Sequence, residues 1–176
     1  MKLVFWGLIF LFFNFDLHVG NSTITLLPAF AGYAKIYVGL GEVVECERFQ
    51  EVRPEAKWAA IYSAVIWILN CTGLFVSGVI ARVLAIVLSI VGLVFQIYIT
   101  YYIAKGVCEL EEDYDLILYA KELMFSWKVV LVCLIVSQIL AWLNAGVLAL
   151  ITLIVFLIAA IGYVVLFYKA WKGYEE

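Results

Sequence analysis

The stretch VLAIVLSIVGLVFQIYITYYIA, residues 83–104, decides the fold of this chain, because its 22 residues contain no charged side chain. A helix that crosses a lipid bilayer needs about 20 predominantly apolar residues. A buried strand or a core helix of a soluble domain is rarely so long. The stretch therefore predicts a transmembrane helix.

The rest of the chain has the same apolar character. Of its 176 residues, 67% are hydrophobic and 14% are charged, and its mean hydropathy is +1.10. Soluble domains hold about 45–50% apolar and about 25% charged residues. The excess falls in six apolar runs: Leu3–Phe15, Ile24–Leu40, Trp58–Val76, Val83–Ala104, Trp127–Leu143 and Val147–Phe167. We therefore predict an all-α membrane protein of about six transmembrane helices, in a single domain over 1–176 that lies in the lipid bilayer.

The links between these runs alternate in length. Three are brief and turn-like, including DLHVGNST after the first run, whereas the links at 41–57 and 105–126 are long and charged. This alternation predicts three helical hairpins, at about 1–45, 57–105 and 126–170. The second and third hairpins begin and end on similar short sequences, which is the pattern of a hairpin repeat, known from transporters. Helical hairpins also resemble one another without common ancestry.

The long links carry patterns of their own. The run ELEEDYD (109–115) is acidic and lacks the spacing of a calcium loop, so we expect a solvated link. The stretch that follows it, as far as Phe125, has the helical spacing of an amphipathic surface helix. Val44–Val52 is expected to continue the helix of the second run into the cytoplasm.

Basic residues indicate the orientation. The side of the long links and the two chain ends holds nine of the 11 Lys and Arg residues, counting Lys128 at the very start of the fifth run, while the short links hold only Arg82 and Lys35 lies within the second run. Lys and Arg collect on the cytoplasmic side of membrane proteins. We therefore predict a multi-pass protein with both the N and C termini in the cytoplasm.

One stretch carries a resemblance to a known group of proteins. LLPAFAGYAKIYVGL (26–40), followed by GEVVECERFQEVRP (41–54), resembles small uncharacterised polytopic membrane proteins of Gram-positive bacteria, over roughly residues 5–55. These proteins often have an acidic residue after the proline, where this chain has Ala29, so no role for that acid is carried over. The resemblance implies the bacterial cytoplasmic membrane and no particular activity.

Lys35 is the most unusual residue of the apolar runs. It shares a helix face with Gly32 and Gly39, and small residues mark the face where membrane helices approach closely. An ammonium at the middle of a membrane costs at least about 2.5–3.5 kcal/mol. Lys35 is therefore expected to face the helix bundle, where a partner or water can offset this cost.

Asp16 is the candidate partner of Lys35. Counting helical rise from the ends of the first two runs puts the two residues within about 6 Å of each other in depth. We predict an intramembrane Asp16–Lys35 pair, with His18 and Asn14 as nearby hydrogen-bond or relay residues. In the alternative, Lys35 extends its side chain to the cytoplasmic interface and Asp16 caps the outer end of the first run.

Three uncharged polar residues, Asn70, Gln96 and Gln138, fall near the middle of other runs. Such residues commonly form interhelical hydrogen bonds that average about 0.6 kcal/mol each. They could equally line a polar cavity for a small solute at mid-membrane, where transporters bind their substrates. The sequence leaves both interpretations open.

Several function classes are disfavoured. A net charge of −3 argues against nucleic acid, and a single histidine with four cysteines of irregular spacing suits neither a metal site nor a catalytic triad. We therefore predict no catalytic residues, no cofactor and no enzyme. The favoured function is a small-solute transporter or a membrane-embedded solute-binding subunit, as a homo-oligomer or with a partner membrane subunit. The alternative is a structural, assembly or immunity-type membrane protein.

Overall fold

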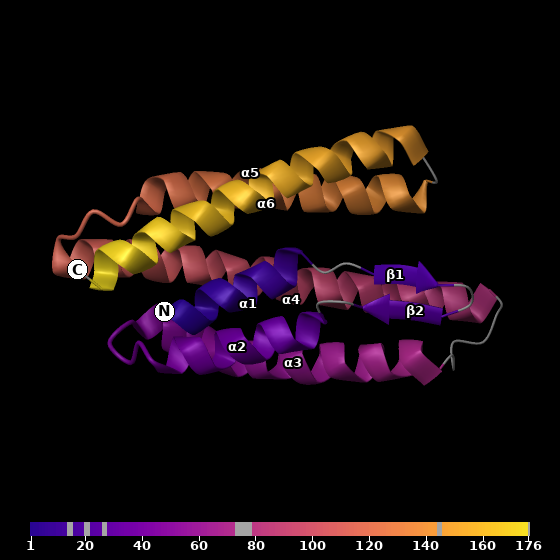
Figure 1. The fold of residues 1–176 in the computed structure, drawn as a ribbon, viewed down its shortest axis with the longest axis horizontal. Coiled ribbons are helices and arrows are strands. Elements are labelled where there is room, and N and C mark those ends of the chain that lie inside the picture. Colours follow the sequence, from indigo (N-terminus) through magenta and orange to yellow (C-terminus); the bar gives the residue numbers. More distant parts are fainter. Residues whose placement is uncertain (14–15, 20–21, 26–27, 73–78, 144–145, 176) are drawn as a thin grey trace. The chain divides into compact units, whose positions relative to one another are not determined.

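The structure is a computed structural model that describes residues 1–13, 16–19, 22–25, 28–72, 79–143 and 146–175 (Figure 1). Within these ranges the chain forms six helices and one pair of strands, in this order: α1 (Lys2–Phe12), β1 (Asp16–Val19), β2 (Ser22–Thr25), α2 (Ala29–Gly41), α3 (Glu47–Thr72), α4 (Val79–Tyr114), α5 (Ala120–Trp142) and α6 (Gly146–Glu175). The predicted helical fold class is confirmed, with the addition of the small hairpin.

The strands replace what was predicted to be a simple turn. β1 and β2 pair in antiparallel register, from Asp16 opposite Thr25 to Val19 opposite Ser22. Three of the four residues of β2 are Thr or Ile, whose branching at Cβ favours strands over helices. As a consequence α1 ends at Phe12 and α2 begins at Ala29, so the first two helices are shorter than the apolar runs.

Three of the six helices are long and apolar enough to cross a membrane, over Val83–Tyr114, Ala120–Leu140 and Leu150–Glu175. The prediction of six spanning helices is not supported, because α1 and α2 have only 11 and 13 residues. The first half of α3 is charged, and its predicted apolar run continues into residues outside those described. The hairpin repeat is not supported either.

The two long links are shorter than predicted. The helices leave only residues 42–46 and 115–119 as connections, because α3 already begins at Glu47 and α4 continues to Tyr114. The acidic run is therefore the end of α4 rather than a solvated link. The segment Val44–Val52 does not extend α2, and the predicted surface helix is interrupted until α5 begins at Ala120. The charged residues therefore belong to the start of α3 and the end of α4 rather than to loops between helices.

The described chain divides into two compact units, Met1–Ile99 and Thr100–Glu176. In the first unit α2 packs against both α1 and α3. Glycine makes the α1–α2 contact close: a Cβ atom at Gly39 would lie 2.7 Å from the backbone nitrogen of Val4, and one at Gly32 would lie 2.9 Å from the carbonyl oxygen of Gly7. The prediction that Gly32 and Gly39 mark a close helix contact is confirmed.

The second unit combines the end of α4 with the antiparallel helices α5 and α6 (Figure 1). Its core consists of apolar and aromatic side chains that are fully buried, among them Ile103, Leu110, Leu118, Leu123, Tyr163 and Phe167. All of these lie toward the 115–119 connection and the end of α6. The second unit is therefore packed mainly at one end of its helices.

The remaining lengths of the long helices expose aliphatic side chains. Within the most apolar window of each of the three candidate spans, no more than 28% of residues are buried. Exposed side chains of α6 include Val147, Ile151, Ile154 and Ile158. Surfaces of this size are stable only against an apolar environment, since burial of apolar area is the main stabilising term in folding. The described helices thus support a membrane protein in contact with lipid.

Candidate functional site

Lys35 lies half-buried in the middle of α2. Its Nζ atom is 5.4 Å from the centroid of the Phe10 ring on α1. A cation over an aromatic face is stabilised by about 0.5–1 kcal/mol at an exposed site and by more where water is excluded. The structure therefore gives this ammonium a partner that the sequence did not predict.

The predicted Asp16–Lys35 pair is not tested by the structure. Asp16 and His18 belong to β1, of which the structure describes the backbone, and Asn14 lies outside the described residues. The depth count that motivated the pair assumed helix on both sides, at about 1.5 Å per residue. Strands rise about 3.3 Å per residue, so that count no longer applies. The pair remains a prediction.

The predicted midplane residues lie on α3, α4 and α5, and whether they line one cavity stays a prediction. Asn70 is exposed, while Gln96 and Gln138 are half-buried. Tyr62 marks the register of α3 on α4, because its hydroxyl donates to the carbonyl oxygen of Leu88 at 2.5 Å. Since the two helices run in opposite directions (Figure 1), Asn70 and Gln96 lie on opposite sides of this contact. Gln138 belongs to the other unit.

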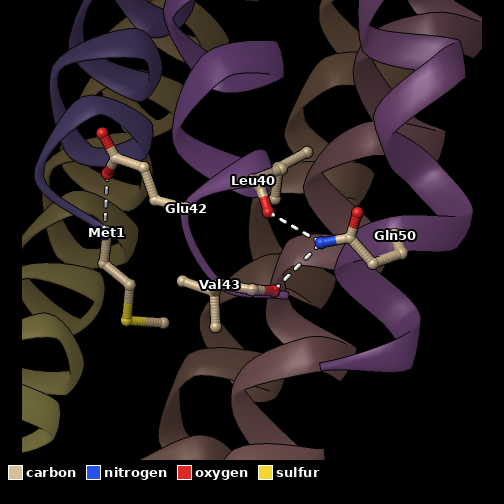
Figure 2. Close-up of polar contacts among 5 residues, drawn as sticks. All are labelled: Met1, Leu40, Glu42, Val43 and Gln50. Carbon is tan, nitrogen blue, oxygen red and sulfur yellow. Dashed lines mark hydrogen bonds and ion pairs between the residues drawn. The ribbon is translucent and has the colours of Figure 1, made fainter. Parts of the chain in front are cut away.

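The connection between α2 and α3 contains a group of polar contacts that the sequence did not suggest. Figure 2 shows the amide nitrogen Nε2 of Gln50 donating to the carbonyl oxygens of Leu40 and Val43, both at 3.0 Å. The last carbonyls of a helix lack partners within it, and Gln50 satisfies two in this region. The amino group of Met1 lies 3.4 Å from an Oε atom of Glu42, which ties α1 to the same connection.

Arg53 completes this junction. Its guanidinium carbon lies 4.9 Å from the centroid of the Tyr37 ring, and a Cβ atom at Gly41 would lie 2.7 Å from it. The Nε atom of Arg53 is buried without a hydrogen-bond partner among the described residues. Stacking of a guanidinium on an aromatic ring compensates for such a loss in part. These contacts fasten three helices together.

Thr100 joins the three helices of the second unit. Its hydroxyl accepts from the indole nitrogen of Trp127 at 3.2 Å, and its carbonyl oxygen accepts from the hydroxyl of Tyr163 at 2.8 Å. Thr100 and Tyr163 are fully or almost fully buried. Buried polar groups need such partners, because an unsatisfied one costs about 1–3 kcal/mol. The contacts also fix the register of α4, α5 and α6.

Glu111 holds the connection between α4 and α5. Its carboxylate accepts from the backbone nitrogens of Leu118 at 2.8 Å and Ala120 at 3.0 Å, which satisfies donors at the start of α5. Asp115 and Tyr119 have φ angles of 50° and 56° in this connection. Left-handed backbone is uncommon for residues other than glycine, so the cap offsets a local cost.

An open groove lies between α5 and α6. It has a volume of about 510 Å³, and its lining consists of residues from both helices: Lys121, Glu122, Phe125, Ser126, Val129, Ala159, Gly162 and Leu166. The small side chains at its floor leave the space, since a Cβ atom at Gly162 would still be 3.7 Å from the hydroxyl of Ser126. Binding sites for small molecules commonly measure about 300–1,000 Å³.

The groove was not predicted from the sequence. The sequence pattern indicates only a surface helix around Lys121 and Phe125, and Ala159 and Gly162 lie in an unbroken apolar run. The pairing of small residues on two facing helices could have indicated it, but their register is set by contacts at Thr100 that no local pattern reveals. Among the described residues, no three His, Cys, Asp or Glu side chains gather as metal ligands would.

Comparisons with known proteins give no further direction. Profiles of protein families, curated proteins and solved structures were each compared with the chain, and none matches it. The resemblance of residues 5–55 to small membrane proteins of Gram-positive bacteria therefore remains a prediction. The groove, with its charged end and apolar floor, has the size and the lining of a binding site for a small molecule.

Proposed function

We propose that the chain is an integral membrane protein that binds an amphipathic solute in the groove between α5 and α6. The observation that carries this proposal is the composition of the groove. Lys121 and Glu122 stand at one end, and Phe125, Val129 and Leu166 continue away from them. A ligand with a polar head and an apolar body would match this groove, whose lining is charged at one end and apolar along the rest. This function belongs to the solute-binding class that the sequence favours.

The proposed orientation places residues 42–46, residues 115–119 and both termini in the cytoplasm of a bacterial cell. Nine Lys and Arg residues of the chain lie at this end of the predicted segments, against Arg82 at the other. In this arrangement α3, α4, α5 and α6 cross the bilayer as helices. The uncharged and aliphatic halves of the long helices then lie in hydrocarbon.

We extend this proposal to α1 and α2, each with its strand. A helix of 11 residues and a strand of four together measure about 30 Å, which is the thickness of the hydrocarbon core. Strand edges in lipid need cover from protein, and β2 contacts α3. The six predicted crossings would then consist of four helices and two helix–strand segments.

The solute-binding proposal is tested by what the purified protein carries. We expect native mass spectrometry of the protein in mild detergent to detect a bound amphiphile. Ala159→Phe would fill the groove and remove that ligand. Ile158→Phe adds a similar ring to an exposed position of α6 outside the groove and should retain it. Equal ligand content in the two variants would overturn the proposal.

The proposed orientation is tested with single cysteines introduced into a variant in which Cys46, Cys71, Cys108 and Cys133 are all replaced. An impermeant maleimide applied to intact cells should label Leu143→Cys and Val19→Cys, while Val44→Cys and Ile117→Cys should react only after permeabilisation. Labelling of Val44→Cys from outside would contradict the orientation. An unreactive Val19→Cys would contradict the helix–strand crossings alone.

A second function, in structural assembly, is favoured by one face of α3. Trp58, Ile61, Val65 and Ile68 are exposed at helical spacing along this helix. Such a stripe suits a partner helix, either from a second copy or from another membrane subunit, as well as lipid. Efficient disulfide cross-linking of Ile61→Cys between copies in membranes would support assembly. Absence of the cross-link, with a ligand in the groove, would favour solute binding.

A further inference from the structure

The two charged residues at the end of the groove have opposite signs. Lys121 and Glu122 are neighbours in the first turn of α5, and both side chains are exposed. Neither forms a hydrogen bond or ion pair with another residue in the described part of the chain, in contrast to Lys172, which lies 3.4 Å from Glu175. The groove thus offers one positive and one negative group to a ligand.

The register set by Thr100 gives the depth of these groups. Trp127 on α5 and Tyr163 on α6 both bond to Thr100, so these three residues share a level. Six residues of helix correspond to about 9 Å. Lys121, Lys169 and Lys105 therefore lie about 7–9 Å from the Thr100 level, on the side of the 115–119 connection.

The acidic residues lie farther along the same direction. Glu112 and Asp113 follow Thr100 by 12 and 13 residues of α4, which is about 18–20 Å. The lysines are thus on the membrane side of the acids, where lipid phosphates meet the interface. Lys105 and Lys169 already lie over tyrosine rings, at 5.9 Å from Tyr102 and 5.5 Å from Tyr119. Lys121 makes no ring contact of this kind with any residue that the structure describes.

The apolar floor begins beside these charges and continues toward the Thr100 level and past it. Glu122 and Val129 are separated by seven residues of α5, or about 10 Å. An acyl chain that descends from a headgroup at Lys121 would follow this floor between Phe125 and Leu166. The direction of the groove matches the direction of a lipid chain in the cytoplasmic leaflet.

We propose that the groove binds a phospholipid whose headgroup carries both a phosphate and a primary amine, which is the chemistry of phosphatidylethanolamine. This inference rests on the proposed function and names the ligand class for the same groove. Lys121 donates to the phosphate, and Glu122 accepts hydrogen bonds from the ammonium group. A purely anionic headgroup would meet the carboxylate of Glu122 without a compensating donor.

The test uses the full chain, delipidated in detergent and returned to nanodiscs that contain phosphatidylethanolamine or phosphatidylglycerol with the same acyl chains. Native mass spectrometry should find the ethanolamine lipid retained about tenfold more strongly, as a charge-assisted hydrogen bond would provide. Glu122→Gln should bring the ratio of the two lipids close to one. Lys121→Gln should weaken retention of both lipids.

The variants distinguish failure of the headgroup inference from failure of the site. If the wild-type protein retains both lipids equally, and Ala159→Phe releases both, the headgroup inference is wrong while the solute-binding groove stands. If Ala159→Phe retains the ethanolamine lipid as strongly as Ile158→Phe does, both proposals are wrong. A preference for phosphatidylglycerol that Glu122→Gln leaves unchanged would also overturn the headgroup inference.

Discussion

The side chains of the α1–α2 pair differ in their surroundings from those in the C-terminal half of α5 and the N-terminal half of α6. In the first pair Leu8 and Ile36 are 0% exposed, because neighbouring helices cover them. In the second pair, Val147 and Ile158 of α6 are 75% and 66% exposed, although both side chains are aliphatic. Short helices are thus stabilised by protein contacts, whereas the long helices depend on lipid.

The glycines of the two pairs show the same difference. Gly7, Gly32 and Gly39 leave no room for a Cβ atom between α1 and α2, while Gly162 leaves ordinary contact distance to α5. Close packing leaves no open space between α1 and α2 at these positions. Looser packing leaves the second with the groove that we propose as a binding site.

The largest effect is expected from removing a side chain that protein contacts bury. Leu8→Ala should lower the free energy of unfolding by about 2–5 kcal/mol, since it leaves a cavity in the α1–α2 contact. Ile158→Ala, at an exposed position, should stay within about 0.5 kcal/mol of the wild type. Thermal and denaturant unfolding in one detergent would measure both. Similar losses for the two variants would contradict the comparison.

A smaller but clear effect is expected from adding one methyl group at the close contact. Gly39→Ala would place Cβ against the backbone of Val4, which cannot move as a side chain can, and should cost about 1–3 kcal/mol. Gly162→Ala has space and should be neutral or slightly stabilising, since alanine favours helix by up to about 1 kcal/mol. If the Gly39→Ala protein were as stable as the Gly162→Ala protein, the close packing of α1 on α2 would be contradicted.

The cap at the start of α5 predicts an intermediate effect. Glu111→Ala removes the acceptor for the backbone nitrogens of Leu118 and Ala120 and should cost about 1 kcal/mol. Hydrogen exchange at these two amides should become faster. Glu112→Ala is the matched control, because this neighbour is exposed and forms no such bonds with described residues. Equal exchange in both variants would exclude the cap.

The smallest effect concerns Lys35. Lys35→Met should lower stability by about 0.5–1 kcal/mol through loss of its contact with Phe10. A double-mutant cycle with Phe10→Leu should give a coupling of that size. A cycle with Asp16→Asn tests the predicted ion pair independently. Coupling to Asp16 and none to Phe10 would support the Asp16–Lys35 ion pair and contradict a stabilising contact between Lys35 and the Phe10 ring.

The sequence predicted the helical class because uninterrupted apolar runs such as 83–104 have few other interpretations. It also predicted the close α1–α2 contact, since Gly32 and Gly39 recur one helical face apart. It missed the hairpin, where the strand preference of Thr23 to Thr25 outweighed the short apolar run. It also overestimated the length of the two long links, because charged residues such as Glu47 and Glu111 indicate a link by composition but lie within α3 and α4.

Most of the candidate site could not be predicted, because it depends on register between helices. Ser126 and Gly162 face each other only because Trp127 and Tyr163 bond to the same threonine. Local spacing along one helix does not contain that information. The ring contact of Lys35 could not be predicted for the same reason: the charge of a lysine suggests a carboxylate partner, whereas the ring of Phe10 on the facing helix lies close to the ammonium.

Hydrophobic photolabelling tests the central difference between the two regions most directly. A diazirine dissolved in the bilayer of native membranes should modify residues 147–158 of α6 heavily, and peptide mass spectrometry would locate the label. Leu8, Ile36 and Leu40 should remain almost unmodified, since other helices cover them. Protection of 147–158 to the same degree as α1 and α2 would mean that protein rather than lipid surrounds these residues, and would contradict the account.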